Sequence, residues 1–378
     1  MKYKEIELAS MGECTGCMAC VDACNHKAVT LESDTNGFLY PRIDKSKCVA
    51  CHRCTIKCPV INWNLVQLRK PKMNFAARIE DDNERKNCTS GGICTALAKH
   101  FIMHGDIVYG AAFVKGSGVK HIRISELNQL ELLKGSKYTQ SKMCGVYSSI
   151  AKDLKDTKKE ILFVGTPCQV ASINHYFKYS PRITTVSFIC GGVMSHKMLC
   201  DYLNEKGVRY PDIKSIQFRE KQTYLIKICK LNGDSFCESR KKSVYLKSFD
   251  AGFTIRKSCQ TCVFCRRERP GDITVGDYWG IENTNLSSSN KESMSCLLIN
   301  SIKGLNLANK LSNLFIEQST IDDIARYNHR IDKPRETARL SFQITVFNIL
   351  YHFLNFHKSV RATILISRIF INRFTKRK

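Results

Sequence analysis

The stretch CTGCMACVDAC at residues 14–24, matched in spacing by CVACHRCTIKCP at residues 48–59, decides the fold of the first part of the chain. In each copy the cysteines are spaced C-x2-C-x2-C-x3-C. Three cysteines two residues apart let one tight loop present three thiolates to a cube of iron and sulfide, while the fourth cysteine binds the neighbouring cube. The repeat therefore predicts two 4Fe-4S clusters. The two expected ligand sets are Cys14, Cys17, Cys20 and Cys58, and Cys48, Cys51, Cys54 and Cys24.

This predicted module covers residues 1–65 and has the pattern of a small bacterial-type ferredoxin. Residues 28–31 and 38–43 are expected to be the strands of a hairpin that turns at Asn36 and Gly37. Because so small a module buries little core, its clusters would also hold it together. The alternative is a pair of zinc sites, but tetrahedral zinc usually takes paired ligands and does not need four cysteines in each half.

Composition limits the class of protein. The chain has 378 residues, of which 43% are hydrophobic and 25% charged, as expected for a globular protein of two or three units. Twenty cysteines, with no apolar signal segment near the start, predict a cytoplasmic protein whose cysteines bind metal. The formal net charge of +25 favours acidic partners, such as a ferredoxin-like electron carrier, an anionic membrane face or a phosphorylated substrate. No nucleic-acid motif is present, so no nucleic-acid partner is expected.

The main part of the chain, residues 72–335, alternates strand-like and helix-like runs and predicts an α/β sheet domain, so the fold class is α/β (α+β) overall. A strand at residues 161–164 ends in GTPCQ, a strand at residues 183–189 ends in CGG, and a helix-like run follows each. The carboxyl ends of parallel strands lie along one edge of a sheet, and ligands bind there. We therefore expect Cys168 and Cys190 to face one another.

Two further cysteines, Cys259 and Cys262, could complete a third four-cysteine site with Cys168 and Cys190. Considered separately, Cys168 and Cys190 are as well explained as buried structural thiols, because free cysteine behaves as a small hydrophobe. The nearby Cys265 could also replace Cys168 or Cys190 as a ligand. Spacing leaves these alternatives open.

Six motifs connect the chain to a known family. They are SGGI at residues 90–93, GSKY at 135–138, GTPCQ at 165–169, CGGV at 190–193, C-x2-C at 259–262 and DITVGDYWG at 272–280. Together they resemble the coenzyme F420 hydrogenase/dehydrogenase β-subunit family, which includes 7-hydroxymethyl chlorophyll a reductase, over residues 1–300. The resemblance implies an FAD-binding domain with its own 4Fe-4S cluster close to the flavin. Cysteines matching Cys168, Cys190, Cys259 and Cys262 would hold that cluster, and Cys265 is additional to the pattern.

The flavin site is expected outside a standard dinucleotide fold, because no G-x-G-x-x-G follows a strand. Glycines at the start of the helix-like run after residue 92 would let a phosphate approach backbone N–H groups, although Ser and Gly also occur there as plain caps. The resemblance, and not spacing, suggests these groups for the flavin: Ser90, Gly91, Gly92, Lys137, Tyr138, Thr139, Ser141, Gly276 and Asp277. No catalytic residue is identified; His175 and His196 are candidate general acids only by their position near strand ends.

These features lead to two hypotheses on function. In the first, the chain is a flavin-dependent iron-sulfur oxidoreductase that passes electrons between a ferredoxin-like donor, or a deazaflavin, and a small organic substrate. Relatives beside polysaccharide-assembly functions suggest a saccharide precursor, although no residue here identifies a sugar site. In the second, the chain is an electron-transfer subunit that serves a separate catalytic partner and has no substrate of its own.

The C-terminal tail, residues 336–378, is predicted to be helical, basic and amphipathic. Its uncharged run, residues 342–356, is too short to span a bilayer. A basic helix with an apolar face can lie on anionic lipid at the inner face of the membrane. It can equally pack on the protein's own core or on a partner subunit. The sequence does not choose between these alternatives.

Overall fold

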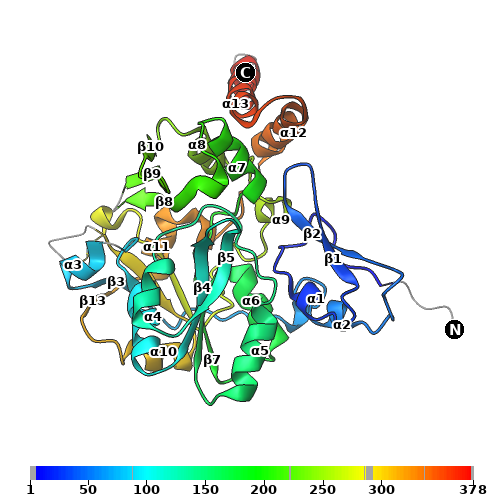
Figure 1. Cartoon of the computed structure of the whole chain (residues 1–378). Coiled ribbons are helices and arrows are strands. Elements are labelled where there is room, and N and C mark those ends of the chain that lie inside the picture. Colours follow the sequence, from blue (N-terminus) through cyan, green and yellow to red (C-terminus); the bar gives the residue numbers. More distant parts are fainter. Residues whose placement is uncertain are drawn as a thin grey trace.

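A computed structural model describes residues 6–86, 88–220, 223–284, 286, 293–335 and 337–375. Its N-terminal module holds the strands β1 (Val29–Ser33) and β2 (Leu39–Ile43) and the short helices α1 (Ala19–Asp22) and α2 (Arg53–Ile56). The strands pair antiparallel, and Gly37 takes a φ of 84° in the turn between them, which confirms the predicted hairpin. The module lies at one side of the molecule (Figure 1).

The largest element is an eight-stranded mixed sheet with the order β13-β3-β12-β11-β7-β6-β4-β5. Four neighbouring strands, β11, β7, β6 and β4, run parallel, and the remaining pairs are antiparallel. The strand bounds are β3 Met73–Ile79, β4 Ile107–Val114, β5 Gly118–Ile124, β6 Ile161–Gly165, β7 Ile183–Phe188, β11 Ile273–Asp277, β12 Ser295–Ile299 and β13 Leu314–Gln318. The predicted strands at 161–164 and 183–189 are confirmed as β6 and β7.

Helices cover both faces of this sheet because alternate strand residues are apolar on each face. Leu162 and Val164 of β6 pack in the core with α4 (Ile93–Met103) and α10 (Ile302–Ala308). Ile161 and Phe163 pack on the opposite face. There the core includes α5 (Val146–Asp156), α6 (Pro167–Tyr176) and residues of α1 in the N-terminal module. The remaining helices of this region are α3 (Asp82–Lys86) and α11 (Ile321–Tyr327).

A second, antiparallel sheet lies beyond the carboxyl ends of the parallel strands (Figure 1). It contains β8 (Ile213–Glu220), β9 (Thr223–Lys230) and β10 (Ser235–Ser239). Three helices accompany it: α7 (His196–Asn204), α8 (Val244–Ala251) and α9 (Lys257–Gln260). The sequence analysis did not predict this sheet. The short 3-10 helices are η1 Trp63–Leu65, η2 Leu127–Leu132, η3 Tyr210–Asp212, η4 Ile281–Asn283 and η5 His329–Ile331.

The C-terminal tail forms two helices, α12 (Ala338–Phe353) and α13 (Phe356–Thr375), so its predicted helical character is confirmed. One face of the pair is buried with α7, α8 and the second sheet through Leu340, Phe347, Tyr351, Phe356 and Val360. This core continues across the predicted boundary at residue 335, and the three domain limits stay predictions. In the described part of the chain, no helix combines the length and the apolar character needed to cross a bilayer.

Candidate redox site

The first set of cysteines surrounds a small cavity inside the N-terminal module. Cys14, Cys17, Cys20 and Cys58 line this space of about 20 Å³, which we call the inner cavity, and apolar side chains close it. Burial raises the pKa of the Cys58 thiol to about 11, and the nearby Cys17 and Cys14 raise it further. The fold therefore gathers the set that the cysteine spacing predicts, with Cys58 contributed by the other repeat.

The second set lies farther out in the same module. Burial raises the pKa of Cys54, and Cys24 and Cys48 are close enough to raise it too. The Ala28 N–H donates a hydrogen bond to Cys24 Sγ over 3.3 Å. Cys51 is exposed. The cysteines of this set thus lie near the protein surface.

The backbone of the two cysteine loops suits a negatively charged cluster. Gly16 and Met18 in the first repeat have φ values of 68° and 64°, and the equivalent Ala50 and His52 have 53° and 58°. Left-handed residues alternating with right-handed ones turn successive N–H groups toward one side, a geometry found at many iron-sulfur sites. Non-glycine residues adopt it only where the surroundings enforce it. The sequence repeat is therefore a conformational repeat, and both loops fit a 4Fe-4S cluster.

The GTPCQ motif gives Cys168 its position at the end of β6. Thr166 is the N-cap of α6, and its capping box with Gln169 satisfies the first N–H groups of the helix. Pro167 occupies the first turn, where its missing N–H has no cost. Cys168 thereby projects from the helix start at the carboxyl edge of the sheet, where Cys190 follows β7. This confirms that both cysteines lie at one edge.

A second cavity, of about 30 Å³, is lined by five cysteines, and we call it the middle cavity. Its cysteines are Cys168, Cys190, Cys259, Cys262 and Cys265. Cys259 has Cys190, Cys262 and Cys168 as electrostatic neighbours, and each adds to the rise in its pKa that burial causes. Cys265 interacts chiefly with Cys262, which lowers the pKa of Cys265. The fold therefore gathers the four cysteines of the predicted third site, with the fifth beside them.

Positive charge and unpaired donors surround the middle cavity. Arg330 and Arg335 line it, and the fully buried Arg269 has Cys265, Cys262 and Cys190 as its nearest opposite charges. The Nε atoms of Arg269 and Arg335 and the Oγ1 of Thr15 are buried without a hydrogen-bond partner among the described residues. An anionic cluster with about two net negative charges would supply acceptors and charge for such donors. The donor set therefore fits a 4Fe-4S cluster.

Single-ion sites were a separate alternative. In the residues that the structure describes, no three His, Cys, Asp or Glu side chains converge closely enough to hold one metal ion. In a 4Fe-4S cluster the cysteine thiolates hold a cube of iron and sulfide between them.

A third and larger space of about 290 Å³, here the outer cavity, lies at the carboxyl ends of β6, β7 and β11. Eight of the nine residues suggested for the flavin line it: Ser90, Gly92, Lys137, Tyr138, Thr139, Ser141, Gly276 and Asp277. Gly91 is the exception. A Cβ at Gly91 would lie 2.3 Å from the Ala77 carbonyl, and its N–H donates to Ser295 Oγ, so its role is to pack the start of α4 against the sheet.

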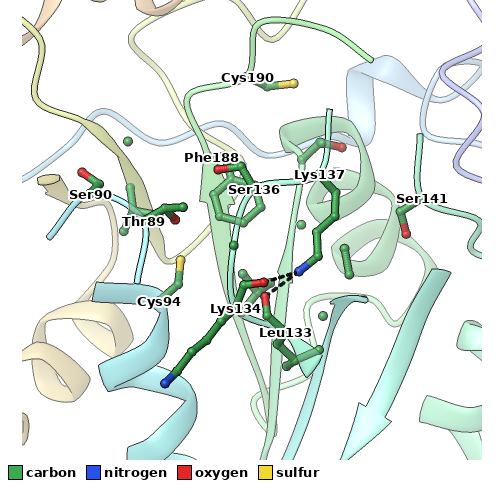
Figure 2. Close-up of a pocket in the computed structure, with 18 of the residues that line it drawn as sticks. Thr89, Ser90, Cys94, Leu133, Lys134, Ser136, Lys137, Ser141, Phe188 and Cys190 are labelled. Carbon is green, nitrogen blue, oxygen red and sulfur yellow. Dashed lines mark hydrogen bonds between the residues drawn. The ribbon is translucent and has the colours of Figure 1, made fainter. Parts of the chain in front are cut away.

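Lys137 lies on the wall of the outer cavity and holds its own loop. Its Nζ donates hydrogen bonds to the carbonyls of Leu133 and Lys134, each over 2.8 Å, as Figure 2 shows. Burial lowers the pKa of Lys137 to about 7 because the surrounding protein disfavours the charge. Around neutral pH this lysine therefore changes between a cation and a neutral amine.

Ser141 is oriented by a buried histidine that the sequence analysis missed. His121 Nε2 lies 3.1 Å from the Val164 carbonyl, and its Nδ1 lies 2.6 Å from Ser141 Oγ. Burial lowers the pKa of His121 to about 4, so the ring is neutral and has one N–H. A carbonyl can only accept, so the N–H is on Nε2, and Nδ1 accepts from the serine. Ser141 is left with its lone pairs as acceptors for a ligand.

Asp277 does not have free acceptors toward the outer cavity. Arg219 donates to its Oδ1 over 2.6 Å, and the Tyr224 hydroxyl donates to its Oδ2 over 3.1 Å. Arg219 comes from the second sheet, which no sequence pattern indicated. Its contact holds that sheet over the end of β11 and gives the outer cavity a cationic side.

The two histidines considered as general acids lie elsewhere. His175 Nε2 contacts the Ile56 carbonyl over 2.8 Å, where α6 meets the N-terminal module. His196 packs edge-on against Tyr210 and lies 3.4 Å from Cys200 Sγ. Both roles are filled by packing contacts, so position near a strand end was a poor guide.

The three cavities lie in a row and share walls. Thr15 lines both the inner and the middle cavity, and Cys168 has Cys17 of the inner set as an electrostatic neighbour. Cys190, with Thr166 and Gln169, lines both the middle and the outer cavity. A continuous path of cysteine-lined spaces therefore leads from the N-terminal module to the sheet edge.

Comparisons with known proteins agree with this arrangement. Residues 158–324 match the family described as the C terminus of the coenzyme F420 hydrogenase/dehydrogenase beta subunit, and residues 13–62 match the 4Fe-4S dicluster domain. No curated protein sequence matches the chain. A chain in the structure of the F420-reducing NiFe hydrogenase complex from Methanosarcina barkeri is similar in fold, with a TM-score of 0.51 and 16% identity, covering 74% of this chain and 95% of that chain. The present chain is thus an iron-sulfur redox protein that belongs to the coenzyme F420 hydrogenase/dehydrogenase β-subunit family and carries an N-terminal 4Fe-4S dicluster domain.

Proposed function

We propose that this protein is an iron-sulfur flavoprotein that passes electrons between a one-electron carrier and a small organic substrate. The observation that carries the proposal is the row of inner, middle and outer cavities with shared walls. Bound clusters would supply one-electron transfer, and bound FAD would supply the exchange between single electrons and hydride chemistry. The substrate would bind beside the flavin in the outer cavity, and its identity is open.

The residues of the outer cavity support an anionic, partly aromatic ligand. The start of α4 at Gly92 offers backbone N–H groups, and Lys137 offers a cation. Ser141 offers an acceptor, because its hydroxyl proton is donated to His121. Apolar side chains such as Ile93, Val164 and Phe188 line the rest of the space. Mixed apolar walls with a few fixed polar groups are typical of cofactor sites.

An acidic electron carrier is the donor that we propose for the exposed cysteine set. Cys51 is exposed, and so are Val49 and Ile56 beside it. Residues 45–62 contain four Lys or Arg residues and no Asp or Glu. An apolar patch with surrounding cations is complementary to an acidic protein and would speed its association. A ferredoxin or a reduced deazaflavin remains the proposed partner at this surface.

A subunit role without its own substrate is the second candidate. The similar fold comes from a chain of a hydrogenase complex, so this chain too could deliver electrons to a catalytic partner. Bound flavin with no turnover of small substrates by the isolated chain, together with a stable complex from its source, would favour this role.

The exposed side of α13 supports peripheral membrane contact. Leu365, Ile366 and Ile369 are exposed on this helix. Residues 337–378 contain eight Lys or Arg residues and no Asp or Glu. An apolar strip among cations suits anionic lipid.

Reduction by ferredoxin in cysteine variants tests the proposed path. Reduced ferredoxin should reduce the bound flavin of the wild-type protein under anaerobic conditions. Cys20→Ser should abolish this reduction because it removes a ligand of the inner cavity. Cys237→Ser is the matched control, since Cys237 is exposed on β10 and lines none of the three cavities. Equal flavin reduction in Cys20→Ser and in the control would refute the path.

A further inference from the structure

Arg256 lies fully buried where the N-terminal module meets the main domain. It directly precedes α9, the helix that carries Cys259 of the middle cavity. Burying a guanidinium is expensive unless it is paired and hydrogen-bonded. Its contacts therefore indicate what the charge is for.

The guanidinium of Arg256 is bound mainly by the loop of the inner cavity. Its Nε donates to the Cys14 carbonyl over 2.8 Å, and Nη2 lies 3.6 Å from Cys14 Sγ, within hydrogen-bond distance for sulfur. Nη2 also donates to the Leu39 carbonyl over 3.0 Å, and Nη1 to Gln140 Oε1 over 3.0 Å. No carboxylate is among these partners. The sulfur of Cys14 is thus the one partner that can carry a full negative charge.

The backbone of Arg256 holds the middle cavity. The Cys259 N–H donates to the Arg256 carbonyl over 2.9 Å, and the Arg256 N–H donates to the Val193 carbonyl, also over 2.9 Å. The neighbouring Ser258 hydroxyl donates to the Cys14 carbonyl over 3.0 Å. A single residue therefore contacts a cysteine of each cavity, by side chain on one side and by main chain on the other.

The surroundings fix the guanidinium in place. It lies over the ring of Tyr40 at 4.2 Å and near that of Phe38 at 5.7 Å. Gly16 leaves the necessary space, because a Cβ there would lie 2.8 Å from Arg256 Nη1 and 2.4 Å from Gln140 Nε2. The charge cannot move away into solvent, and it stays beside Cys14 in every state of the protein.

We propose that Arg256 is a positioning residue that links the two clusters and sets the reduction potential of the inner one. Reduction adds one negative charge to a cluster, and a fixed cation near a ligand sulfur stabilises that charge. Arg256 therefore raises the reduction potential of the inner cluster and holds it at a constant distance from the middle one. This inference rests on the proposed occupancy of the inner and middle cavities by 4Fe-4S clusters.

Potentiometric titration of the anaerobic full-length protein, monitored by EPR, tests the inference. The inner cluster is identified as the signal that Cys20→Ser removes. Arg256→Gln should make its reduction less favourable by about tenfold, since hydrogen bonds to charged groups are worth roughly that or more. For a one-electron couple this is a negative shift of about 59 mV. Arg256→Lys keeps the charge but not the fork of donors, and should shift the potential in the same direction by less.

Two controls isolate the effect. The outer cluster of the same module, removed by Cys51→Ser, should keep its potential in Arg256→Gln. Arg42→Gln, which removes an arginine paired with Glu32 on the module surface, should leave the inner potential unchanged.

An unchanged inner potential in Arg256→Gln with full iron content would overturn the inference. If Arg256→Gln loses iron, Arg256→Lys decides, and a potential equal to that of the wild type would overturn it. Absence of cluster signals from the wild-type protein would refute the proposed function instead, so the two failures are distinguishable.

Discussion

Cys190 is the residue on which the middle and outer cavities meet. It follows β7, lines both spaces, and accepts a hydrogen bond from the Gly192 N–H over 3.4 Å. Cys265 also lines the middle cavity, but its main partner is Cys262 and it does not line the outer one. We therefore assign Cys190 as a ligand and Cys265 as a bystander.

Serine variants of these two cysteines separate their roles. Cys190→Ser should lose about one third of the protein's iron, because a 4Fe-4S cluster depends on its cysteine thiolates. Cys265→Ser should keep all of it. Iron and sulfide assays with EPR provide the measurement. Iron loss in Cys265→Ser together with full iron in Cys190→Ser would reverse the assignment.

Lys137 predicts a pH-dependent affinity for FAD. Its pKa is lowered to about 7, so the cation that attracts an anionic ligand is lost as pH rises through 7. If binding requires the charged form, affinity should fall about tenfold between pH 6 and pH 8. The measurement is quenching of FAD fluorescence on addition to flavin-depleted protein.

Lys137→Met should bind FAD more weakly, with an affinity that is flat over this range. The unfolding free energy changes in the opposite direction: the unfolded chain binds more protons above pH 7, so this lysine's penalty on folding lessens as pH rises. A steep pH dependence that persists in Lys137→Met would assign the effect to another group.

At the residue scale, the sequence identified groups whose spacing is local and missed those paired over long distances. The cysteine loops and the GTPCQ turn are set by neighbours within a few residues. Arg256 contacts Cys14 across 242 positions, and Arg219 contacts Asp277 across 58. No periodicity encodes such pairs. The basic residues just before the C-x2-C motif at 259–262 were the one available hint.

Among the elements, the strand and helix order around β6 and β7 was predictable, because Pro167, the capping box and apolar runs all agree. The second sheet was not. Its strands lie among charged residues, as in Arg219 and Lys227, and one face packs on helices that come from a distant part of the chain. The tail was ambiguous because a helix against a core and a helix against lipid have the same pattern.

Phenylalanine variants in α12 test whether the tail is part of the core. Phe347 is fully buried against Phe253, Tyr351 and Phe356, whereas Phe353 is 78% exposed. Phe347→Ala should lower the unfolding free energy by about 3–5 kcal/mol, as for other buried aromatic truncations. Phe353→Ala should change it by about 0.5 kcal/mol or less. Anaerobic urea unfolding measures both; equal midpoints would mean that α12 does not pack as described.

In the whole molecule, the N-terminal module and the tail are attached to the same central part. The hairpin turn at Asn36 donates to Asn348 of α12 over 2.9 Å and accepts from Ser195 before α7. Tyr351 of α12 donates to Asp201 of α7. The protein is therefore held together around the cavities, and the tail contributes to that frame with one face only.

Vesicle binding tests the other face. Full-length protein should sediment with anionic vesicles and not with zwitterionic ones. Leu365→Glu should weaken this binding, because it places a negative charge in the apolar strip of α13. Leu231→Glu is the control, since Leu231 is similarly exposed but lies in the turn between β9 and β10. Binding that is equal in both variants would rule out α13 as the contact.

The central claim is that three cysteine-lined sites lead to one flavin site in a single chain. Anaerobic purification with quantification of iron, acid-labile sulfide and flavin tests it most directly. The account predicts about twelve iron and twelve sulfide for three 4Fe-4S clusters, with one FAD per chain. Protein isolated with iron and sulfide for two clusters and no flavin would contradict the main-domain sites, and protein without sulfide would contradict the account as a whole.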